Sequence, residues 1–424
     1  MDSTVLFVNN GSGRNLGDLA MLINITSIVR SMKKPTNIYV PRQLPVNFQK
    51  EFKTQIYIPY NECLDRFRSR LGNGILGNVI LRTAYFFHIL CMIIAIPFIR
   101  WSPVKIKFGA GEVQLLNILN SCSAVWLSGG GYLTDKGVFE CRCSLLTALF
   151  AILLGKKVVM TGQGIGPINS ITTELLLKFV VRHSTFIAVR DEIRSMDYLR
   201  QISKGKTPIH MAGDDATSLT KKPVKDCKNQ NIGKETIRIA VHFRISPYTE
   251  NSNQLKHKYC ETIKQIQIQG WRPVFFIFTS QKQWEEDLIN NILRDVPADS
   301  YDIIKTEDPR EIKQIISTCD LAIGVAYHFV VFCLTCGVPV TALYGGEYYH
   351  YKMKGIFQQY SLENCMIKFS NFDPAKTIDN LKNQIEDLDQ TKNRLIERTR
   401  TLEKVHDQII TNILDTISQC EKRN

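Results

Sequence analysis

The chain has 424 residues, which is more than one ordinary hydrophobic core accommodates and indicates two domains. Hydrophobic residues make up 44% and charged residues 22% of the chain, and these ordinary proportions exclude a disordered, a collagen-like and a multi-span membrane protein. The formal net charge of +13 leaves three partner classes open: an anionic substrate, an acidic membrane surface and nucleic acid.

Most of the positive charge lies in the first half of the chain. Residues 1–220 contain 25 basic and 14 acidic side chains, a net +11, whereas residues 221–424 contain 28 and 26, a net +2. No nucleic-acid recognition motif accompanies the excess, and the aromatic residues do not alternate with the basic ones as stacking platforms. Nucleic acid is therefore the least favoured partner.

Apolar runs of strand length, each followed by a helical pattern, recur along the chain. In the first half they are Val5–Val8, Asn37–Val40, Gln55–Ile58, Ala124–Leu127, Lys157–Thr161, Thr185–Val189 and Ile209–Ala212. In the second half they are Ile237–Phe243, Val274–Thr279, Asp302–Lys305, Leu321–Val325, Val338–Leu343 and Met366–Phe369. Continuous apolar runs are typical of strands buried on both faces, as in parallel sheets. The pattern predicts an α/β protein with two doubly wound Rossmann-like domains.

One segment, residues 66–100, is both basic and strongly apolar. Arginines stand at positions 66, 68 and 70, and residues 83–99 run for 17 residues without a formal charge. Seventeen residues are the lower limit for crossing a bilayer, and His88 and Pro97 interrupt the run, so a membrane span is disfavoured. Two interpretations remain, a helix buried under the first sheet and peripheral docking on an anionic membrane.

Composition also suggests the domain boundaries. Residues 1–220 form the first domain, the polar and basic stretch 221–236 a linker, and residues 237–370 the second domain. The final segment, 371–424, is helical, with leucine or isoleucine at every seventh position from 381 to 409. We interpret it as a long helix packed on the domains, with a homodimer through 377–420 as the alternative.

The twelve cysteines are scattered, with no repeated CxxC pair and no secretory signal peptide. This usage predicts a reducing, cytoplasmic location without a disulfide framework. Cys141 and Cys143 have no second Cys or His pair nearby, so we predict neither a zinc site nor any other metal site.

Three glycine-rich turns follow strands of the first domain. They contain Asn15, Gly17 and Asp18; Gly129, Gly130, Gly131 and Asp135; and Gly162, Gln163 and Gly164. Strand ends of one parallel sheet meet at the same edge, so glycines there suggest close approach of a ligand to the backbone, with merely sharp turns as the alternative.

In the second domain, a cation and an imidazole follow two strands. Arg244 ends the strand that begins at Ile237, and His328 stands at a turn between a strand and a helix. Gly345 and Gly346 follow a later strand, with Lys352 and Lys354 beyond them. An imidazole at the edge of the interdomain cleft can donate a proton and bind an anion.

These motifs together resemble the polysaccharide pyruvyl transferase family, whose members resemble GT-B glycosyltransferases in fold. The resemblance covers most of residues 4–370. It rests on Asn15-Leu-Gly-Asp18, Ser128-Gly-Gly-Gly-Tyr132, Thr161-Gly-Gln-Gly-Ile-Gly-Pro167, Ala188-Val-Arg-Asp191 with Ser195, Gly213-Asp-Asp215, Arg244, and the His328 block with Gly337-Val-Pro339.

The resemblance implies transfer of a pyruvyl group from phosphoenolpyruvate to two hydroxyls of a sugar, which gives a pyruvate ketal. On the matching positions His328 is the general acid and Arg244 binds the donor. Many family members have Arg two residues before this His, where this chain has Ala326. Either Lys352 or Lys354 replaces that cation, or the donor is not phosphoenolpyruvate; ordinary solvated surface is the alternative for both lysines. Asp18 or Asp135 is the candidate base, and a capping role for either is the alternative.

The sequence thus predicts a pyruvyl transferase that uses phosphoenolpyruvate as co-substrate and needs no cofactor. Its acceptor is a cell-surface polysaccharide or a lipid-linked precursor, held by the basic first domain, while the second domain binds the donor. The expected location is the cytoplasm, peripheral on the inner face of the membrane. A glycosyltransferase with a nucleotide-sugar donor and a catalytically inactive, membrane-associated member are the alternatives.

Overall fold

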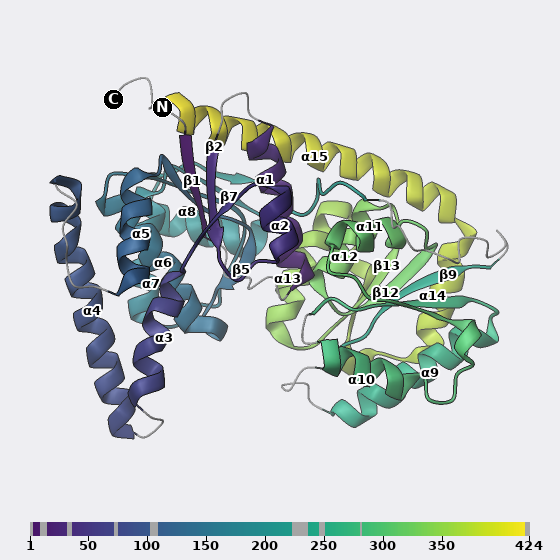
Figure 1. The fold of residues 1–424 in the computed structure, drawn as a ribbon. Coiled ribbons are helices and arrows are strands. Elements are labelled where there is room, and N and C mark those ends of the chain that lie inside the picture. Colours follow the sequence, from purple (N-terminus) through teal and green to yellow (C-terminus); the bar gives the residue numbers. More distant parts are fainter. Residues whose placement is uncertain are drawn as a thin grey trace. The chain divides into compact units, whose positions relative to one another are not determined.

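The computed structural model describes residues 3–8, 15–31, 36–71, 75–101, 109–222, 236–245, 251–279 and 282–419 (Figure 1). By its internal contacts the chain divides into two compact units. The first unit consists of residues 1–13, 25–212 and 407–424, and the second of residues 14–24 and 213–406. Most of the predicted linker, residues 223–235, lies outside the described residues.

The first unit is built on an eight-stranded sheet. Its strands are β1 (Ser3–Val8), β2 (Thr36–Pro41), β3 (Gln55–Tyr57), β4 (Ala124–Leu127), β5 (Gly130–Leu133), β6 (Lys157–Ile165), β7 (Phe186–Val189) and β8 (Ile209–Met211). They pair in the order β3-β2-β1-β4-β6-β7-β8, with β5 joined to β6, and the ladders are parallel. The order changes direction beside β1, as in a doubly wound sheet.

Helices alternate with these strands along the chain. They are α1 (Leu16–Arg30), α2 (Val46–Glu51), α3 (Tyr60–Leu71), α4 (Ile75–Trp101), α5 (Ala110–Ser121), α6 (Val138–Leu153), α7 (Ile171–His183) and α8 (Asp197–Ser203). The central strands are buried on both faces, with Trp126 of β4 and Val158 of β6 fully enclosed. This burial explains why the strands read as continuous apolar runs in the sequence.

The second unit has a six-stranded parallel sheet. Its strands are β9 (Arg238–His242), β10 (Arg272–Phe276), β11 (Asp302–Ile304), β12 (Leu321–Gly324), β13 (Val340–Tyr344) and β14 (Met366–Lys368). They pair in the order β11-β10-β9-β12-β13-β14. This is the doubly wound order whose switch point lies between the first and fourth strands, here β9 and β12, and ligands bind at the carboxyl ends of strands there.

The helices of the second unit and the C-terminal helices complete the fold. They are α9 (Ser252–Ile268), α10 (Lys282–Ile292), α11 (Pro309–Ile316), α12 (Tyr327–Thr335), α13 (Gly346–Tyr360), α14 (Pro374–Glu386) and α15 (Leu388–Gln419). Every predicted strand run overlaps a strand, although the ends differ by up to four residues. Strand β5 was not predicted, because two glycines supply half of its residues and carry no apolar pattern.

The C-terminal segment differs in detail from the single predicted helix. Two helices, α14 and α15, are separated at Asp387, where the backbone leaves the helical conformation. The row of apolar residues at seven-residue spacing is partly buried within the chain itself, since Leu381 is fully enclosed and Leu395 is 1% exposed. Two polar side chains of α15 also have partners within the chain: Lys392 bonds to Asp320 at 3.0 Å and Thr399 to Tyr360 at 2.9 Å.

The contact-based units also differ from the predicted domain boundaries. Residues 213–222 belong to the second unit, whereas the sequence analysis ended the first domain at residue 220. The buried Lys313 explains this, because its Nζ donates to the carbonyls of Thr217 and Leu219 at 2.9 and 2.8 Å. Burial lowers the pKa of Lys313 to about 8. Among the described residues, no helix is long and apolar enough to cross a membrane.

Candidate functional site

His328 lies at the switch point of the second sheet. Strand β12 ends at Gly324 and α12 begins at Tyr327, so the imidazole sits in the first turn of that helix. The neighbouring strand β9 pairs Gly324 with His242, which brings the loops after β9 and β12 together. The side chain of His328 is only 5% exposed. The predicted position at a strand-to-helix turn is therefore the position that the structure gives.

The Asn15-Leu-Gly-Asp18 motif lies against this histidine. The amide of Leu16 donates to the carbonyl of Phe278 at 3.1 Å, and Asn15 forms an isolated β-bridge with Thr279. The amide of Gly17 donates to Oδ1 of Asn15 at 2.9 Å. A Cβ atom on Gly17 would lie 1.9 Å from Nδ1 of His328, so the glycine leaves the space that the imidazole occupies. The sequence analysis had assigned this motif to the acceptor side of the first domain.

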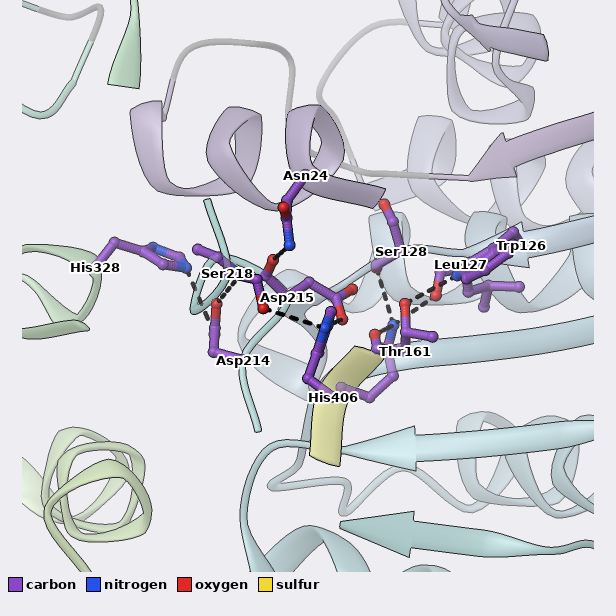
Figure 2. A network of polar contacts seen from close by, with 12 residues as sticks. Asn24, Trp126, Leu127, Ser128, Thr161, Asp214, Asp215, Ser218, His328 and His406 are labelled. Atoms are coloured by element: carbon purple, nitrogen blue, oxygen red, sulfur yellow. Dashed lines mark hydrogen bonds and ion pairs between the residues drawn. The ribbon is translucent and has the colours of Figure 1, made fainter. Parts of the chain in front are cut away.

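Asp214 approaches the other ring nitrogen of His328. Its Oδ2 lies 3.8 Å from Nε2, and both side chains are buried (Figure 2). Oδ1 of Asp214 accepts from the amide of Ala216 at 2.9 Å, which fixes the carboxylate. Gly213, directly before it, has a φ of +81°, a conformation that side-chain-bearing residues rarely adopt. The Gly213-Asp-Asp215 motif thus forms a tight turn that places the carboxylate of Asp214 beside the imidazole of His328.

Asp215 faces a second histidine. Its Oδ1 lies 3.3 Å from Nε2 of His406 on α15, and neither side chain is exposed (Figure 2). Nδ1 of His406 lies 3.5 Å from Oγ of Ser218. The backbone carbonyl of Asp215 accepts from the side-chain amide of Asn24 at 2.8 Å. Buried polar groups that are paired in this way fix one conformation of the turn. Asp215 therefore holds the loop that carries Asp214.

A buried pair, His242 and Glu285, contacts the backbone on two sides of the same site. Nε2 of His242 lies 3.7 Å from Oε1 of Glu285, while its Nδ1 accepts from the amide of Ala326 at 3.3 Å. Oε2 of Glu285 accepts from the amides of Phe278 and Thr279 at 2.8 and 3.2 Å. The pair thereby links the loop before His328 to the loop that binds the Asn15 motif.

The charge of Glu285 is favoured in this position. Burial by itself raises the pKa of a carboxyl group, but hydrogen bonds and charge from His242 and the backbone amides of Phe278 and Thr279 outweigh it. The pKa of Glu285 is consequently lowered from its ordinary value of 4.5. Glu285 is an anion at neutral pH, in a place where no sequence pattern pointed to one.

Two of the predicted cations lie against aromatic rings. The guanidinium of Arg244 stands 5.4 Å from the ring centre of Trp284, and its Nε is buried with no hydrogen-bond partner among the described residues. Nζ of Lys352 lies 4.9 Å from the ring centre of Tyr327, whose ring centre lies 5.1 Å from that of His328. The structure thus brings Lys352 near His328 through one intervening ring.

The remaining predicted donor residues belong to α13 and its start. Lys354 is two residues beyond Lys352, and positions two apart on a helix do not share a face. Gly345 precedes α13 and Gly346 begins it with a φ of +72°. A Cβ on Gly345 would meet the ring of Phe369 at 2.7 Å, so packing within the protein already requires a glycine there.

Among the predicted acceptor residues of the first unit, Gln163 has several buried hydrogen-bond partners. The side-chain amide of Gln163 donates through Nε2 to the backbone carbonyls of Leu127 and Ser128 at 3.0 and 2.9 Å. Gly130 pairs with Gln163 across β5 and β6, with Gly129 and Gly131 on either side of it. The glutamine therefore fastens the end of β4 to the turn in β6 that contains Gly162 and Gly164.

Gly164 and Asp135 have structural partners. A Cβ on Gly164 would lie 2.4 Å from the guanidinium of Arg190, which is only 3% exposed. Oδ2 of Asp135 accepts from the amides of Asn169 and Ser170, the latter at 2.9 Å. These bonds are of the kind expected for the capping alternative, and the role of Asp135 as a base stays a prediction. Asp18 lies in the first turn of α1, and it too has a partner within the chain.

Sequence reasoning missed most of the groups around His328. The Gly213-Asp-Asp215 motif carries no role in the sequence alone, and no pattern there points to His242, Glu285 or His406. Gly213 beside two aspartates was the one available signal, because a glycine before charged residues suggests a tight turn at a strand end. His406 lies 191 residues from Asp215, so no local pattern joins them.

No metal cluster accompanies the site in the part of the chain that the structure describes, where no three His, Cys, Asp or Glu side chains could hold an ion together. Cys141 and Cys143 are buried in α6. Burial raises the pKa of Cys141 to about 12, which keeps the thiol protonated near neutral pH.

Solved structures with the same fold cover nearly the whole chain. The HepE protein of Anabaena, in complex with UDP-glucose, is 12% identical with a TM-score of 0.52 over 99% of this chain and 100% of that one. The UDP-GlcNAc 2-epimerase of Neisseria meningitidis, bound to UDP-GlcNAc, is 11% identical with a TM-score of 0.58 over 98% and 100%. MnaA of S. aureus with UDP is 10% identical with a TM-score of 0.55 over 94% and 91%. No curated protein matched the sequence significantly.

These likenesses confirm the predicted fold class, two Rossmann-like units of the kind found in GT-B glycosyltransferases and the epimerases that share their fold. Residues 15–347 match the model of the polysaccharide pyruvyl transferase family. The chain belongs to this family, and it is a transferase whose acceptor class is a saccharide.

Proposed function

We propose that the protein transfers a pyruvyl group from phosphoenolpyruvate to a sugar of a cell-surface polysaccharide or its lipid-linked precursor, forming a pyruvate ketal. Family membership supports the reaction class. The observation that carries the assignment to residues is the enclosure of His328 between Gly17 and the carboxylate of Asp214.

His328 is the proposed general acid. Its proton goes to the CH₂ carbon of phosphoenolpyruvate, and the adjacent carbon becomes an oxocarbenium-like centre that one sugar hydroxyl attacks. The second hydroxyl then displaces phosphate. One hydroxyl proton returns to His328 through the proposed base and the other leaves with phosphate, so that phosphoenolpyruvate and a diol give a cyclic ketal and inorganic phosphate. Asp214 stabilises the charged imidazole before the proton moves, which is the role of a positioning carboxylate.

The donor side of the proposed site lies in the second unit. Arg244 can bind a carboxylate or phosphate with two parallel hydrogen bonds, and its buried, unsatisfied Nε favours such a ligand. Lys352 supplies the cation that Ala326 does not, with Lys354, Gly345 and Gly346 as further donor residues. No cofactor is required, since both hydroxyl attacks need only proton transfer and fixed positive charge.

The acceptor surface is proposed for the first unit, while the proposed base belongs to the second unit. Asn15 and Gly17 were also acceptor candidates; their contacts with Phe278 and His328 now favour a role in holding the acid. The proposed base is Asp18, in the first turn of α1, because it directly follows Gly17, which contacts His328. The glycines of 129–131 and 162–164, with Gln163, shape the acceptor surface.

A coupled assay of phosphate release tests the reaction. Phosphoenolpyruvate is supplied with candidate saccharides and with lipid-linked oligosaccharides, and the product is examined for a ketal by mass spectrometry. Acceptor-dependent phosphate release by the parent, lost in His328→Ala, is the expected result. Equal release by both proteins removes His328 from the mechanism.

A nucleotide-sugar glycosyltransferase is the second candidate. It is favoured by Ala326, which stands where many family members have Arg, and by the UDP compounds bound to proteins of the same fold. A thermal-shift comparison separates the two, because a ligand that binds the folded state raises the melting temperature. Phosphoenolpyruvate is expected to raise it and UDP-sugars are not; stabilisation by neither supports a catalytically inactive member.

The proposed location is the cytoplasm, peripheral on the inner face of the membrane, where lipid-linked precursors are assembled. A homodimer through residues 377–420 is the weaker proposal for a partner, since Leu381 and Leu395 of that segment are already buried within the chain. Light scattering after gel filtration decides it: a monomer at all concentrations excludes the dimer.

A further inference from the structure

Helix α4 carries an apolar face that nothing in the described chain covers. The side chains on this face are each at least 40% exposed, and all are aliphatic or aromatic: Ile80, Phe86, Phe87, Leu90, Ile94 and Phe98. At 3.6 residues per turn they fall within about 120° of the helix circumference. Soluble proteins rarely expose large apolar side chains in a contiguous group unless the surface binds something.

The opposite side of α4 packs on the first unit. Met92, Ala95 and Ile96 are buried there, against α3, α5 and α6, and Figure 1 shows α4 outermost among these helices. His88 also points inward: its Nε2 lies 3.5 Å from Oε1 of Glu112, and its ring stacks on that of Tyr60. The histidine of the uncharged run is thus turned away from the exposed face.

The charge of the surrounding sequence selects the occupant. Residues 66–111 contain seven basic residues and no Asp or Glu, the basic ones being Arg66, Arg68, Arg70, Arg82, Arg100, Lys105 and Lys107. A second copy of the chain would bring this segment against itself, so that like charges met in either orientation of the helices. Anionic lipid head groups would instead neutralise it.

We propose that α4 docks in the plane of an anionic membrane, with its exposed apolar face in the boundary between head groups and acyl chains. An interfacial helix needs an apolar face on one side and basic residues near the head groups, and it does not need the length of a span. Phe86 and Phe98, 64% and 58% exposed, are the main anchors. This surface is independent of the proposed pyruvyl transfer.

Flotation of the full chain with vesicles tests the surface. The probes are phosphatidylcholine vesicles and vesicles of equal parts phosphatidylcholine and phosphatidylglycerol. The test variant is Phe86→Asp/Phe98→Asp; the matched control is Ile171→Asp/Leu175→Asp on α7, whose side chains are 73% and 60% exposed. We expect the parent and the control to float with the anionic vesicles. The affinity of the test variant for these vesicles should be lower by roughly tenfold or more.

Three results overturn the proposal. One is a parent that fails to float with anionic vesicles, and another is a test variant that floats as well as the parent. The third is a parent that dimerises in solution and becomes monomeric in the test variant, which assigns the face to a second copy. If the test variant melts earlier than the control, the milder Phe87→Ser/Ile94→Ser takes its place. Phosphate release with a water-soluble acceptor is measured in parallel, so that loss of docking and loss of transfer are distinguished.

Discussion

Gly17 and His328 occupy each other's space: a Cβ on the glycine would lie 1.9 Å from Nδ1 of the imidazole and 2.6 Å from its Cβ. Neither neighbour can yield easily, because the amide of Gly17 is bonded to Asn15 and the imidazole is enclosed by Asp214. The glycine of the Asn15-Leu-Gly-Asp18 motif is therefore explained by the protein's own histidine.

Gly17→Ala is the first prediction. The added methyl group must displace the imidazole, and overpacking of this kind destabilises a protein by about 1–3 kcal/mol. We expect acceptor-dependent phosphate release to fall at least as far as in His328→Ala, and the midpoint of urea unfolding to decrease. Gly137→Ala is the control, because its Cβ would meet only the flexible end of Glu140 at 3.3 Å. Full activity of Gly17→Ala would mean that His328 works from another position.

The second prediction separates the acid from the residue that positions it. General acid catalysis contributes roughly 10²–10⁴-fold, so His328→Gln should lose kcat by that factor. Asp214→Asn keeps the shape of the side chain but removes its charge, and we expect kcat to fall about tenfold with KM for phosphoenolpyruvate nearly unchanged. A change confined to KM would show that Asp214 contributes to donor binding instead.

The third prediction compares two lysines on one helix. Lys352 lies beside Tyr327, and Lys354 faces another side of α13. Lys352→Ala should raise KM for phosphoenolpyruvate about tenfold or more, because a cation that pairs with phosphate is lost. Lys354→Ala is the comparison on the same helix, and it should raise KM by a smaller factor than Lys352→Ala does. The reverse ranking would transfer the phosphate contact to Lys354.

The fourth prediction concerns stability in acid. The folded-state pKa of Glu285 lies below its ordinary value of 4.5, so its ionised form stabilises the fold above that pH. This stabilisation is lost as pH falls through the folded-state pKa, since the proton then neutralises the partner of His242. The free energy of unfolding, measured in urea at neutral pH and below pH 4.5, should depend less on pH in Glu285→Gln than in the parent.

The neighbouring Glu286→Gln is the control for that measurement. Glu286 forms a partly exposed ion pair with Lys305 at 2.8 Å, and such pairs contribute little to stability. Its pH dependence should match that of the parent. If Glu285→Gln also matches the parent, the buried pair does not contribute to acid stability.

The fifth prediction is independence from divalent metal. The proposed reaction relies on Arg244 and lysine for positive charge, so treatment with EDTA should leave turnover unchanged within twofold. Turnover is measured before treatment, after it, and after addition of magnesium. Loss of activity in EDTA that magnesium restores would contradict the proposal and direct attention to acidic residues such as Asp214.

The fold could be predicted because buried parallel strands leave a signal that is local in the sequence. Runs such as Leu321–Val325 mark β12, and a following helix is expected wherever two such strands are parallel. The same reasoning placed His328 and Arg244 at strand ends. It failed at β5, where glycines occupy strand positions that carry no hydrophobic pattern.

The surroundings of His328 could not be predicted in the same way. The contacts of Gly17, Asp214 and Glu285 join segments that are far apart in the sequence, and each depends on three-dimensional packing. The apolar segment 83–99 was ambiguous for a related reason. Periodicity showed a helix but could not show that His88 turns inward and the phenylalanines outward.

The pairing of Asp215 with His406 has a consequence for synthesis of the protein. Domains usually fold from the N-terminus as the chain leaves the ribosome. Here the partner of Asp215, His406, is translated 191 residues later. Until then the Asp215 carboxylate cannot form this pair. The second unit also contains residues 14–24, made long before the rest of it. We therefore expect the Gly213–Asp215 turn to be among the last parts of the nascent chain to become ordered.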